Sequence, residues 1–480
     1  MSRIKHILVA ILFTSTLMSY AGGADQESRP FTNNAMAPLD MKDDPKQWSD
    51  FKRHLKIAKR IGIDAISIDV WWGTVERQGD NQFDWAYYDK LVTVIEDADL
   101  HWVPIMSFHR CGGYVGEACN ALIPDWIWSN YENKGVGRED MLYRSENDDY
   151  SDEAVSLWQD HLVINQYIEF MNAFEEHFAD KADKIDEINI SMGASGELRY
   201  PAYNPRDPRC DYPTRGCFQA YSTAAKADFI NYAKLKYNTI GALNSAWGTK
   251  LTGFTQVIPP DDGTPNDGRA ETFIQNNNHI ETQYGRDFID WYHQSLVDHG
   301  ERMLDAGLQA FNGAFANIEI GLKIAGIHWQ MSENAPNPRV TEMAVGVIPS
   351  SVDFDDRQTG YGYGKIIQLV ASYKNKRSIA LHFTNLEGDD LDIIGGKNAY
   401  SQARTQVNYL ARAAKDAGIR LKGENALSFG VENEHGWDNI NLSVTENTFH
   451  GLTVLRVSNV TDNVIGQKRY QQFIADSKKK

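Results

Sequence analysis

The stretch from Ser191 to Tyr203 holds the first residues that could carry out chemistry. An alternating apolar run before it predicts a short buried strand, and a Gly-Ala-Ser-Gly turn then places Glu197 beside Arg199. A carboxyl group just past a strand end, in cationic and aromatic company, is a candidate acid. The alternative is a glutamate paired with Arg199 in a solvated loop, because such ion pairs are common. The rest of the chain must decide between the two interpretations.

Polar residues recur near the ends of other strand-like runs. The predicted strands are residues 35–39, 65–72, 101–108, 188–192, 318–325, 378–383, 420–423 and 452–455, with predicted helices between them. The polar residues near their ends are Asp69, His109, Glu197, Lys323, Thr384, Glu424 and Arg456. Repeated βα units predict an α/β fold, a (β/α)8 TIM barrel, whose active site lies at the carboxyl ends of the strands.

The segment from Tyr203 to Thr272 interrupts this pattern. It contains Pro205, Pro208 and Pro213 and two cysteines, with a predicted helix near residues 220–237, and it is too long for a plain βα loop. We therefore expect long loops to form a small lobe at the C-terminal face of the barrel, at about residues 203–272. The predicted organisation is a single catalytic domain over residues 22–480.

Charge and aromatic content narrow the class of partner. The formal net charge of −17 at pH 7 argues against nucleic acid or an anionic membrane as the partner. Aromatic residues make up 11% of the chain, including 12 Trp and 22 Tyr, which suits contact with sugar rings but is also typical of large cores.

The first 21 residues resemble a secretory signal peptide. Arg3 and Lys5 precede an apolar run over residues 7–18, and small residues lead to Ala21. No later stretch reaches the roughly 18 apolar residues of a membrane span. We expect a secreted protein, extracellular or periplasmic, with no membrane association after removal of residues 1–21.

The four cysteines form two close pairs along the chain. Cys111 lies near Cys119, and Cys210 lies near Cys217. Oxidation is expected in an exported chain, and of the three possible pairings the local one is favoured. The spacing lacks the CxxC pattern and the clustered histidines of a zinc site.

Seven segments together resemble the beta-amylase family, and its bacterial members more than its plant members. They are DVWWGTVE (69–76), SFHRCGGYVGEACN (107–120), GELRYPAY (196–203), KIAGIHWQM (323–331), FTNLE (383–387), GENAL (423–427) and TVLR (453–456). They follow the family's order over most of the chain. The resemblance implies an inverting exo-hydrolase that cuts α-1,4-glucosidic bonds of starch, glycogen and maltodextrins from non-reducing ends and releases β-maltose.

Two glutamates match the family's catalytic pair. Glu197 in GELRYP corresponds to the general acid and Glu424 in GENAL to the general base. The reaction needs a protonated carboxyl group at the leaving oxygen and an ionised one that activates water on the opposite face of the sugar, roughly 6.5–9.5 Å apart. The alternative for Glu424 is a cap or a loop salt bridge.

The resemblance also implies a set of substrate contacts. They are Asp69 and His109 at the innermost sugar, Glu117 in a glycine-rich lid over residues 112–117, Lys323, His328 and Trp329 on the reducing side, and Asn425, Ala426 and Arg456. Thr384 matches the residue that supports the proton donor after proton transfer. Singly, each has a structural alternative, such as a core histidine for His328 or packing for Trp329. Their joint occurrence at strand ends favours a site.

Two segments depart from the family pattern. The family commonly has Asp where Glu117 stands and Asn where Tyr114 stands, which puts the lid's contact with the sugar in doubt. Cys111 and Cys119 bracket this lid, as in bacterial members. The segment from Asn334 to Tyr363 is longer than expected for the family.

No cofactor is required by a hydrolysis of this kind, although some bacterial members bind a structural calcium ion. The matching positions are Glu76, Asp80, Asn81, Gln166 and Glu169, with Gln166 in place of a carboxylate. Oxygen ligands suit calcium, and the alternative is a solvated acidic surface. We expect an α-1,4-glucan as partner, a monomer, and no separate starch-binding domain.

Two competing functions remain open at this point. Another barrel glycosidase, such as a retaining β-galactosidase-like enzyme, would place a nucleophile close to the acid, and the anomer of the first product would separate it. A catalytically silent maltodextrin-binding relative would keep the fold without needing both Glu197 and Glu424.

Overall fold

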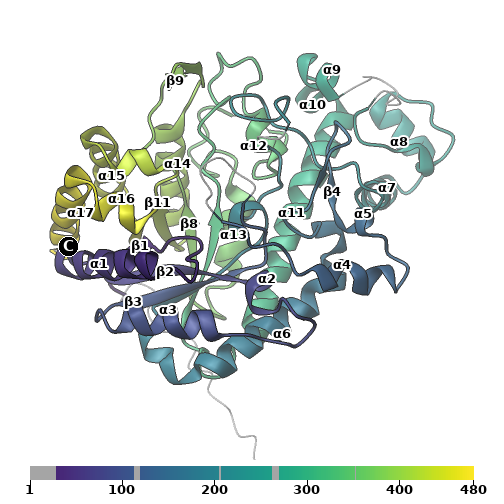
Figure 1. Cartoon of the computed structure of the whole chain (residues 1–480). Coiled ribbons are helices and arrows are strands. Elements are labelled where there is room, and N and C mark those ends of the chain that lie inside the picture. The colour runs from purple at the N-terminus through teal and green to yellow at the C-terminus, as the bar shows by residue number, and fades with distance from the viewer. Residues whose placement is uncertain (1–28, 113–118, 205–206, 262–269, 352, 480) are drawn as a thin grey trace, which may run out of the picture.

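Eight parallel strands close into a barrel, in the order β1-β12-β11-β8-β7-β6-β3-β2. The computed structural model describes residues 29–112, 119–204, 207–261, 270–351 and 353–479. The barrel strands are β1 (Thr32–Met36), β2 (Ala65–Trp71), β3 (His101–Ser107), β6 (Glu187–Ile190), β7 (Glu319–Ile324), β8 (Ile379–Phe383), β11 (Arg420–Glu424) and β12 (Gly451–Val454). The predicted (β/α)8 barrel is therefore confirmed (Figure 1).

Helices surround the barrel and bury their apolar faces against it. The longer ones are α1 (Pro45–Ile61), α3 (Ala86–Glu96), α6 (Asp160–Phe178), α11 (Gln283–Ala310), α13 (Gly364–Ser372), α14 (Ala403–Asp416), α15 (Glu434–Glu446) and α17 (Val464–Ser477). In α1 the Asp44 side chain caps Lys46 N, Pro45 starts the helix, and Gly62 ends it with φ of 98°. Local sequence thus sets where this helix begins and ends.

Further helices and two hairpins lie in the loops between these elements. They are α2 (Trp72–Val75), α4 (Asp125–Glu132), α5 (Arg138–Met141), α7 (Thr223–Tyr237), α8 (Ile240–Trp247), α9 (Ala270–Gln275), α10 (Asn278–Glu281), α12 (Val340–Ala344) and α16 (Val457–Thr461), with the hairpins β4 (Tyr143–Arg144)–β5 (Tyr150–Ser151) and β9 (Ile393–Ile394)–β10 (Lys397–Asn398). Helices α7, α8, α9 and α10 gather at the upper right of Figure 1. Most of them come from the segment in which we expect the inserted lobe.

The first strand begins earlier than the apolar pattern predicts. The sequence favours residues 35–39, whereas β1 runs from Thr32 to Met36. Asn33 and Asn34 are buried polar residues, and Asn33 is held by hydrogen bonds from its backbone and side-chain nitrogens to Asp64 Oδ2, at 2.9 and 3.2 Å. Buried amides with partners are compatible with a strand, and a hydrophobicity pattern does not detect them.

Charged rather than aliphatic side chains fill much of the barrel interior. Along β11 the buried charged residues alternate with apolar ones, because successive side chains of a strand point to opposite faces. Gly321 on β7 makes room for this arrangement: a Cβ atom there would lie 2.1 Å from Glu187 Oε1. The interior is a network of ion pairs, and the apolar core lies between the strands and the helices.

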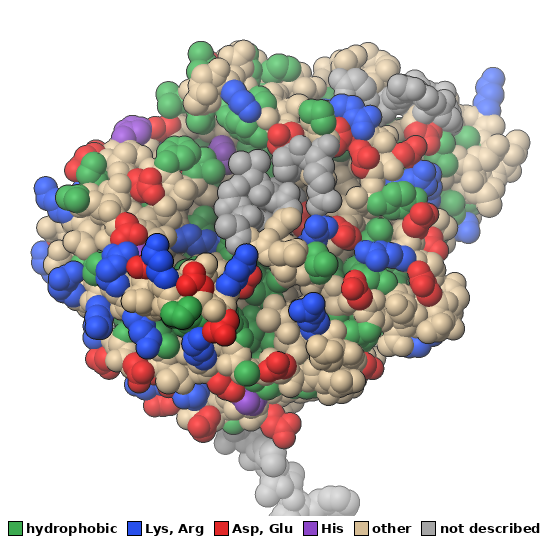
Figure 2. Space-filling view, viewed as in Figure 1, with side chains coloured by type: hydrophobic (Ala, Val, Ile, Leu, Met, Phe, Trp, Pro, Cys, Tyr) green, Lys and Arg blue, Asp and Glu red, His purple; other side chains and the backbone are tan. Residues whose placement is uncertain are grey.

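The outer surface mixes both charges. Figure 2 shows Lys and Arg side chains gathered at the lower left, over the exposed face of α1. Two of these, Arg53 and Lys59, pair with Asp462 and Asp99 at 2.7 and 2.6 Å. Among the described residues, no helix is both long and apolar enough to cross a bilayer.

Candidate active site

Glu197 lies directly after a sharp turn that follows β6. Ser195 and Gly196 adopt left-handed φ values of 53° and 78°, and Leu198 N donates to Lys323 O at 2.7 Å, which fixes the turn against β7. Arg199 is 1% exposed, and its Nε lies 2.8 Å from Glu197 Oε2. Burial raises the pKa of Glu197, and the charge of Glu424 adds to this while Arg199 opposes it. Glu197 thus holds its proton more tightly than a free glutamate does.

Glu424 ends β11 in a cationic environment. Its Oε1 lies 2.8 Å from Lys323 Nζ and 2.9 Å from His382 Nδ1, and its side chain is 6% exposed. Burial works against ionisation of Glu424, but Lys323 and His382 outweigh it and lower the pKa of Glu424 to about 2. This carboxyl group is therefore ionised at any ordinary pH.

The two glutamates have opposite protonation preferences within one site. Burial holds a proton on Glu197, while two cations hold Glu424 ionised. A pair of carboxyl groups with pKa values pushed apart is the arrangement that general acid and general base catalysis needs. It can protonate a leaving oxygen and activate a water molecule at the same pH.

His109 approaches the same turn from β3. A Cβ atom at Gly196 would lie 3.1 Å from His109 Cε1, so the glycine lets the imidazole pack against the Glu197 turn. Nδ1 of the ring forms a hydrogen bond with Ser191 Oγ at 2.8 Å. Burial, followed by the charges of Arg199 and Lys323, lowers the pKa of His109 to about 3, so the ring is neutral at pH 7.

Asp69 lies on the adjacent strand, β2. Its Oδ1 accepts a hydrogen bond from Ser107 Oγ at 3.0 Å, which orients the carboxylate from the end of β3. The next aromatic residue along β2, Trp71, packs its ring edge-on against His109 at 5.0 Å between centroids. The structure thus brings the two residues predicted for the innermost sugar to the same side of the barrel.

Lys323 on β7 and the two residues His328 and Trp329 after it have distinct surroundings. Lys323 is the ion-pair partner of Glu424, so its ammonium group already lies against a carboxylate. Trp329 is 4% exposed and donates from Nε1 to Thr214 O at 2.8 Å, so it packs and anchors a loop. His328 is half-buried, and its ring lies 5.1 Å from that of Trp329.

Thr384 follows β8 and fixes a neighbouring turn. Its Oγ1 accepts a hydrogen bond from Gly326 N at 2.7 Å. This bond ties the segment after β7 to the segment after β8. The role of Thr384 beside the proton donor stays a prediction.

The residues after Glu424 are held by a buried carboxylate. Glu387 accepts hydrogen bonds from Ala426 N at 3.1 Å and Leu427 N at 2.7 Å. Asn425 bonds both backbone groups of Leu455, with Oδ1 2.8 Å from the nitrogen and Nδ2 3.0 Å from the oxygen. Burial, opposed by the backbone donors, raises the pKa of Glu387 to about 7. Sequence analysis gave Glu387 no role, although it lies in the FTNLE segment.

Arg456 follows β12, and its NH1 lies 3.4 Å from Ala37 O. This contact joins the end of the last strand to the segment after the first. The structure thus places Arg456 at the seam where the barrel closes.

Sequence analysis also missed a set of charged residues below Glu424. They are Glu187, Glu319, His382, Arg420 and Lys422, and all are buried. The available signal was the alternation of charged and apolar residues in EINI, EIGLKI and RLKGE, which puts the charges on one face of each strand.

The lid prediction falls partly outside the described residues. Tyr114 and Glu117 belong to residues 113–118, about which nothing is described. The disulfide at the base of this segment, Cys111–Cys119, is present with a Cα separation of 5.7 Å. The predicted local pairing is thereby confirmed for this pair.

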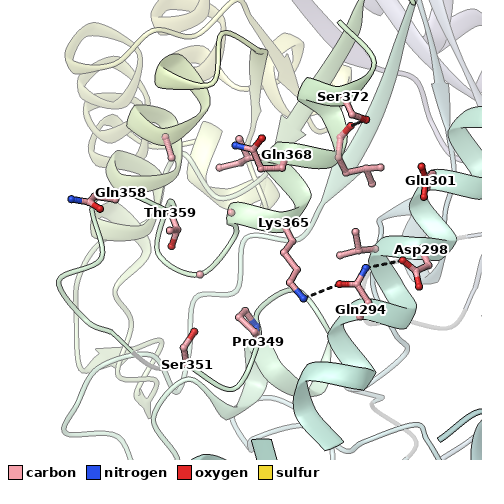
Figure 3. A pocket seen from close by; sticks show the side chains of 16 residues that line it. Gln294, Asp298, Glu301, Pro349, Ser351, Gln358, Thr359, Lys365, Gln368 and Ser372 are labelled. Atoms are coloured by element: carbon pink, nitrogen blue, oxygen red, sulfur yellow. Dashed lines mark hydrogen bonds between the residues drawn. The ribbon is translucent and has the colours of Figure 1, made fainter. Parts of the chain in front are cut away.

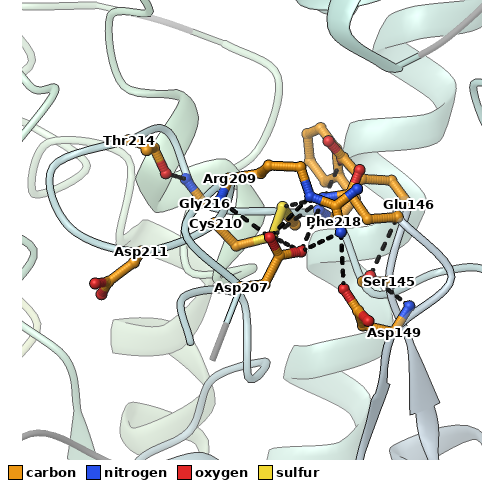
Figure 4. Close-up of a disulfide and its surroundings, with 12 residues drawn as sticks. Ser145, Glu146, Asp149, Asp207, Arg209, Cys210, Asp211, Thr214, Gly216 and Phe218 are labelled. Atoms are coloured by element: carbon orange, nitrogen blue, oxygen red, sulfur yellow. Dashed lines mark hydrogen bonds and ion pairs between the residues drawn. A yellow bond between two sulfur atoms is a disulfide. The ribbon is translucent and has the colours of Figure 1, made fainter. Parts of the chain in front are cut away.

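The second disulfide, Cys210–Cys217, closes a loop that carries Thr214 (Figure 4). Asp207 beside it accepts hydrogen bonds from the backbone N and the Nε of Arg209, at 3.0 and 2.8 Å. Asp207 and the two sulfur atoms lie close enough to suggest a metal site, but both sulfurs are in the disulfide and cannot act as thiolate ligands.

Three of the predicted calcium ligands carry charges that influence one another: Glu76, Asp80 and Glu169. Gln166 Oε1 and Glu169 Oε2 on α6 are buried oxygen atoms without a hydrogen-bond partner in the described part of the chain. Glu76 accepts bonds from Trp72 Nε1 and Asn81 N, each at 2.6 Å. Burial, together with the charges of Asp80 and Glu169, raises the pKa of Glu76 to about 7. Calcium favours oxygen ligands of this kind, and calcium binding by these residues stays a prediction.

A cavity of about 720 Å³ lies away from the two glutamates, between α11, α13 and the segment before α13 (Figure 3). Lys365 Nζ donates to Gln294 Oε1 across it at 2.7 Å. Its lining includes Pro349, Ser351 and Thr359 from the segment that sequence analysis identified as long. The long segment therefore builds an outer groove on the helical layer.

A closed parallel barrel with two inequivalent glutamates at its strand ends defines a barrel glycoside hydrolase. The chain belongs to glycosyl hydrolase family 14, whose sequence pattern matches residues 34–479. The family suggested by the seven sequence segments is thereby confirmed. Hydrolases of this family need no cofactor.

Individual relatives agree with this assignment. The thermophilic beta-amylase of Thermoanaerobacterium thermosulfurigenes is 37% identical over 459 residues, which cover 95% of this chain and 75% of the relative. The beta-amylase of Cytobacillus firmus is 38% identical over 431 residues, or 90% and 83% of the two chains. The crystal structure of the catalytic domain of beta-amylase from Paenibacillus polymyxa matches with a TM-score of 0.78 at 36% identity, covering 93% of this chain and 98% of that one.

Proposed function

We propose that this chain is a beta-amylase that releases β-maltose from the non-reducing ends of α-1,4-glucans. The observation that carries the proposal is the opposite environment of the two glutamates, Glu197 buried beside one arginine and Glu424 paired with two cations. The names of the relatives support the same substrate class.

The proposed reaction is a single displacement with two proton transfers. Glu197 gives its proton to the glycosidic oxygen as the bond from that oxygen to the anomeric carbon breaks. Glu424 takes a proton from a water molecule, whose oxygen attacks the anomeric carbon from the opposite face. The anomeric centre is inverted, so an α-linked glucan gives β-maltose. Arg199 then stabilises the newly formed carboxylate of Glu197 at 2.8 Å.

The substrate contacts are proposed from the same geometry and the family positions. Asp69 and neutral His109 would hydrogen-bond the hydroxyl groups of the innermost sugar, and Glu117 is proposed as a sugar contact from its family position alone. The residues proposed for the reducing side of the cleaved bond are Lys323, His328 and Trp329, and Thr384 would support the proton donor after proton transfer. Further sugar contacts are proposed for Asn425, Ala426 and Arg456. Lys323 would act mainly through Glu424, because its ammonium group already lies against that carboxylate.

We further propose that the mature protein is exported as a monomer. The signal-like layout of residues 1–21 and the two disulfides support secretion, since disulfides persist in oxidising compartments. The proposed unit is one catalytic domain over residues 22–480, with residues 203–272 as its lobe.

The early products of soluble starch test the function directly. Proton NMR should show β-maltose first, and chromatography should show maltose without a ladder of longer sugars. Release of α-maltose would refute the inverting pair, and early longer oligosaccharides would refute attack from the chain end. Binding of maltodextrin without any product would indicate a silent relative.

A further inference from the structure

His382 connects the proposed base to a second buried glutamate. Its Nδ1 lies 2.9 Å from Glu424 Oε1, and its Nε2 lies 2.5 Å from Glu187 Oε1. The His382 side chain is 3% exposed and that of Glu187 is 1% exposed, so water does not compete for these bonds. The imidazole is thus a bridge between two carboxyl groups inside the barrel.

This geometry sets the protonation state of the ring. An ionised carboxylate offers only acceptors, so a ring nitrogen that faces it must carry a hydrogen. Both ring nitrogens of His382 face carboxylate oxygens, which requires the doubly protonated imidazolium form. Burial alone would favour the neutral ring, but Glu187 and Glu424 outweigh it and raise the pKa of His382.

Strand register explains why the bridge can form. His382 on β8 lies level with Lys323 on β7 and with Lys422 on β11. Lys422 Nζ pairs with Glu187 and also with Glu319, which in turn binds Arg420 Nε at 2.7 Å. The barrel interior below the site is therefore a continuous chain of alternating charges.

The far carboxylate is held rigidly enough to act as an anchor. Glu187 is bound by Lys422 and by Asn189 Nδ2 at 3.0 Å, in the space left by Gly321. Lys422 and His382 outweigh burial and lower the pKa of Glu187, so this carboxyl group is ionised. His382 is consequently fixed from below before it meets Glu424.

We propose that His382 is a positioning residue that orients Glu424 and keeps it ionised as the general base. The inference rests on the proposed function of Glu424. The charged groups that face the bridge are Glu187 from β6, Lys323 and Glu319 from β7, Arg420 and Lys422 from β11, and Glu197 with Arg199 from the turn after β6. Without the imidazolium charge, Lys323 is the remaining cation in contact with Glu424.

The pH dependence of turnover then carries the signature of His382. Activity needs Glu424 ionised, so it is lost as pH falls through the pKa of Glu424. Removing one adjacent cation raises a carboxyl pKa by about 1–3 pH units. The acid limb of the kcat/KM profile should therefore move to higher pH in a variant without this charge. KM should stay close to its original value, because His382 is buried and both of its ring nitrogens already bond to carboxylates.

The test uses His382→Asn on the full chain, with His293→Asn as the matched control. His293 is also buried, but it lies on α11, outside the site. Its Nδ1 bonds to Gly346 O at 2.7 Å. We expect the acid limb of His382→Asn to rise by about one pH unit or more, and that of His293→Asn to stay in place. An acid limb that coincides with the wild type in His382→Asn overturns the proposal.

Nitrogen NMR of histidine-labelled protein gives a readout that does not depend on activity. The imidazolium signal of His382 should persist above the ordinary histidine pKa of 6.5, and that signal should be missing from the spectrum of His382→Asn. Glu187→Gln removes one carboxylate but leaves the bond between His382 and Glu424 in place, so it should lower the pH at which the imidazolium signal titrates. A neutral His382 ring below pH 6.5 overturns the proposal. The product anomer distinguishes a failure of this proposal from a failure of the proposed function. His382→Asn should still release β-maltose. Release of α-maltose by the wild type would refute the proposed function instead.

Discussion

Glutamine at either catalytic position should abolish turnover, but the two substitutions should differ in stability. Burial disfavours the charged form of Glu197 and raises its pKa, so a neutral amide suits the same buried position. Glu424 is stabilised by Lys323 and His382, and Glu424→Gln leaves both buried cations without that carboxylate. Glu197→Gln should therefore retain or gain stability, whereas Glu424→Gln should lose it.

The size of the effect follows from the pKa of Glu424. A glutamate whose pKa falls from 4.5 to about 2 on folding contributes about 3 kcal/mol at pH 7, at roughly 1.4 kcal/mol per pH unit. With an unfolding entropy of about 2 cal/mol/K per residue, this loss lowers the Tm of a chain of this length by about 3 °C. The contribution is complete above the unfolded pKa of 4.5 and is lost as pH falls through about 2.

Thermal unfolding of the two variants and the wild type across pH 3–7 is the measurement, with turnover on maltodextrin in parallel. Glu424→Gln should unfold below Glu197→Gln at pH 7, and the gap between Glu424→Gln and the wild type should narrow as pH falls below about 4.5. Equal stabilities of the two variants at pH 7, or a gap that does not change with pH, would show that the assigned electrostatics are wrong.

Three further outcomes are expected. Glu197→Gln should lose roughly 10²–10⁴-fold in turnover of maltodextrin but keep its activity on α-maltosyl fluoride, because fluoride leaves without a proton. Glu424→Gln should lose activity on both substrates. Equal losses in the two variants would contradict the assignment of acid and base. Replacing Cys210 and Cys217 by alanine should raise KM, because their loop accepts hydrogen bonds from Trp329 and Gln330. The matched double variant of Cys111 and Cys119 provides the comparison. Unfolding of the barrel in either double variant would contradict this prediction. EGTA should lower the Tm and added calcium should restore it, and Gln166→Glu should enlarge this change in Tm. A Tm that changes with neither EGTA nor calcium would refute the calcium site.

Several features follow from the sequence because their causes are local. The alternation of apolar residues predicts the barrel strands, and the segments GELRYP and GENAL identify Glu197 and Glu424 as the candidate pair. The cysteine pairs are separated by only a few residues, so proximity along the chain favours the pairing that the structure contains. In each case, one short stretch of chain holds the whole signal.

Other features depend on residues far apart in the chain. The first strand begins at Thr32 because Asn33 finds Asp64 as a partner, and no apolar pattern announces that hydrogen bond. Trp329 matches a substrate contact of the family in sequence, yet its indole is buried and donates a hydrogen bond to Thr214 O in the disulfide loop. Burial and partner choice are properties of the folded chain.

The sequence determined the barrel, the family and the identity of the two glutamates, because these depend on patterns within single segments. Only the tertiary structure decided how the glutamates differ. Residues 195 positions apart meet in the His382–Glu187 bond, and Lys323 and His382 come from two strands to contact Glu424. A carboxyl pKa depends on desolvation and on charges within a few ångströms, and closure of the barrel creates both.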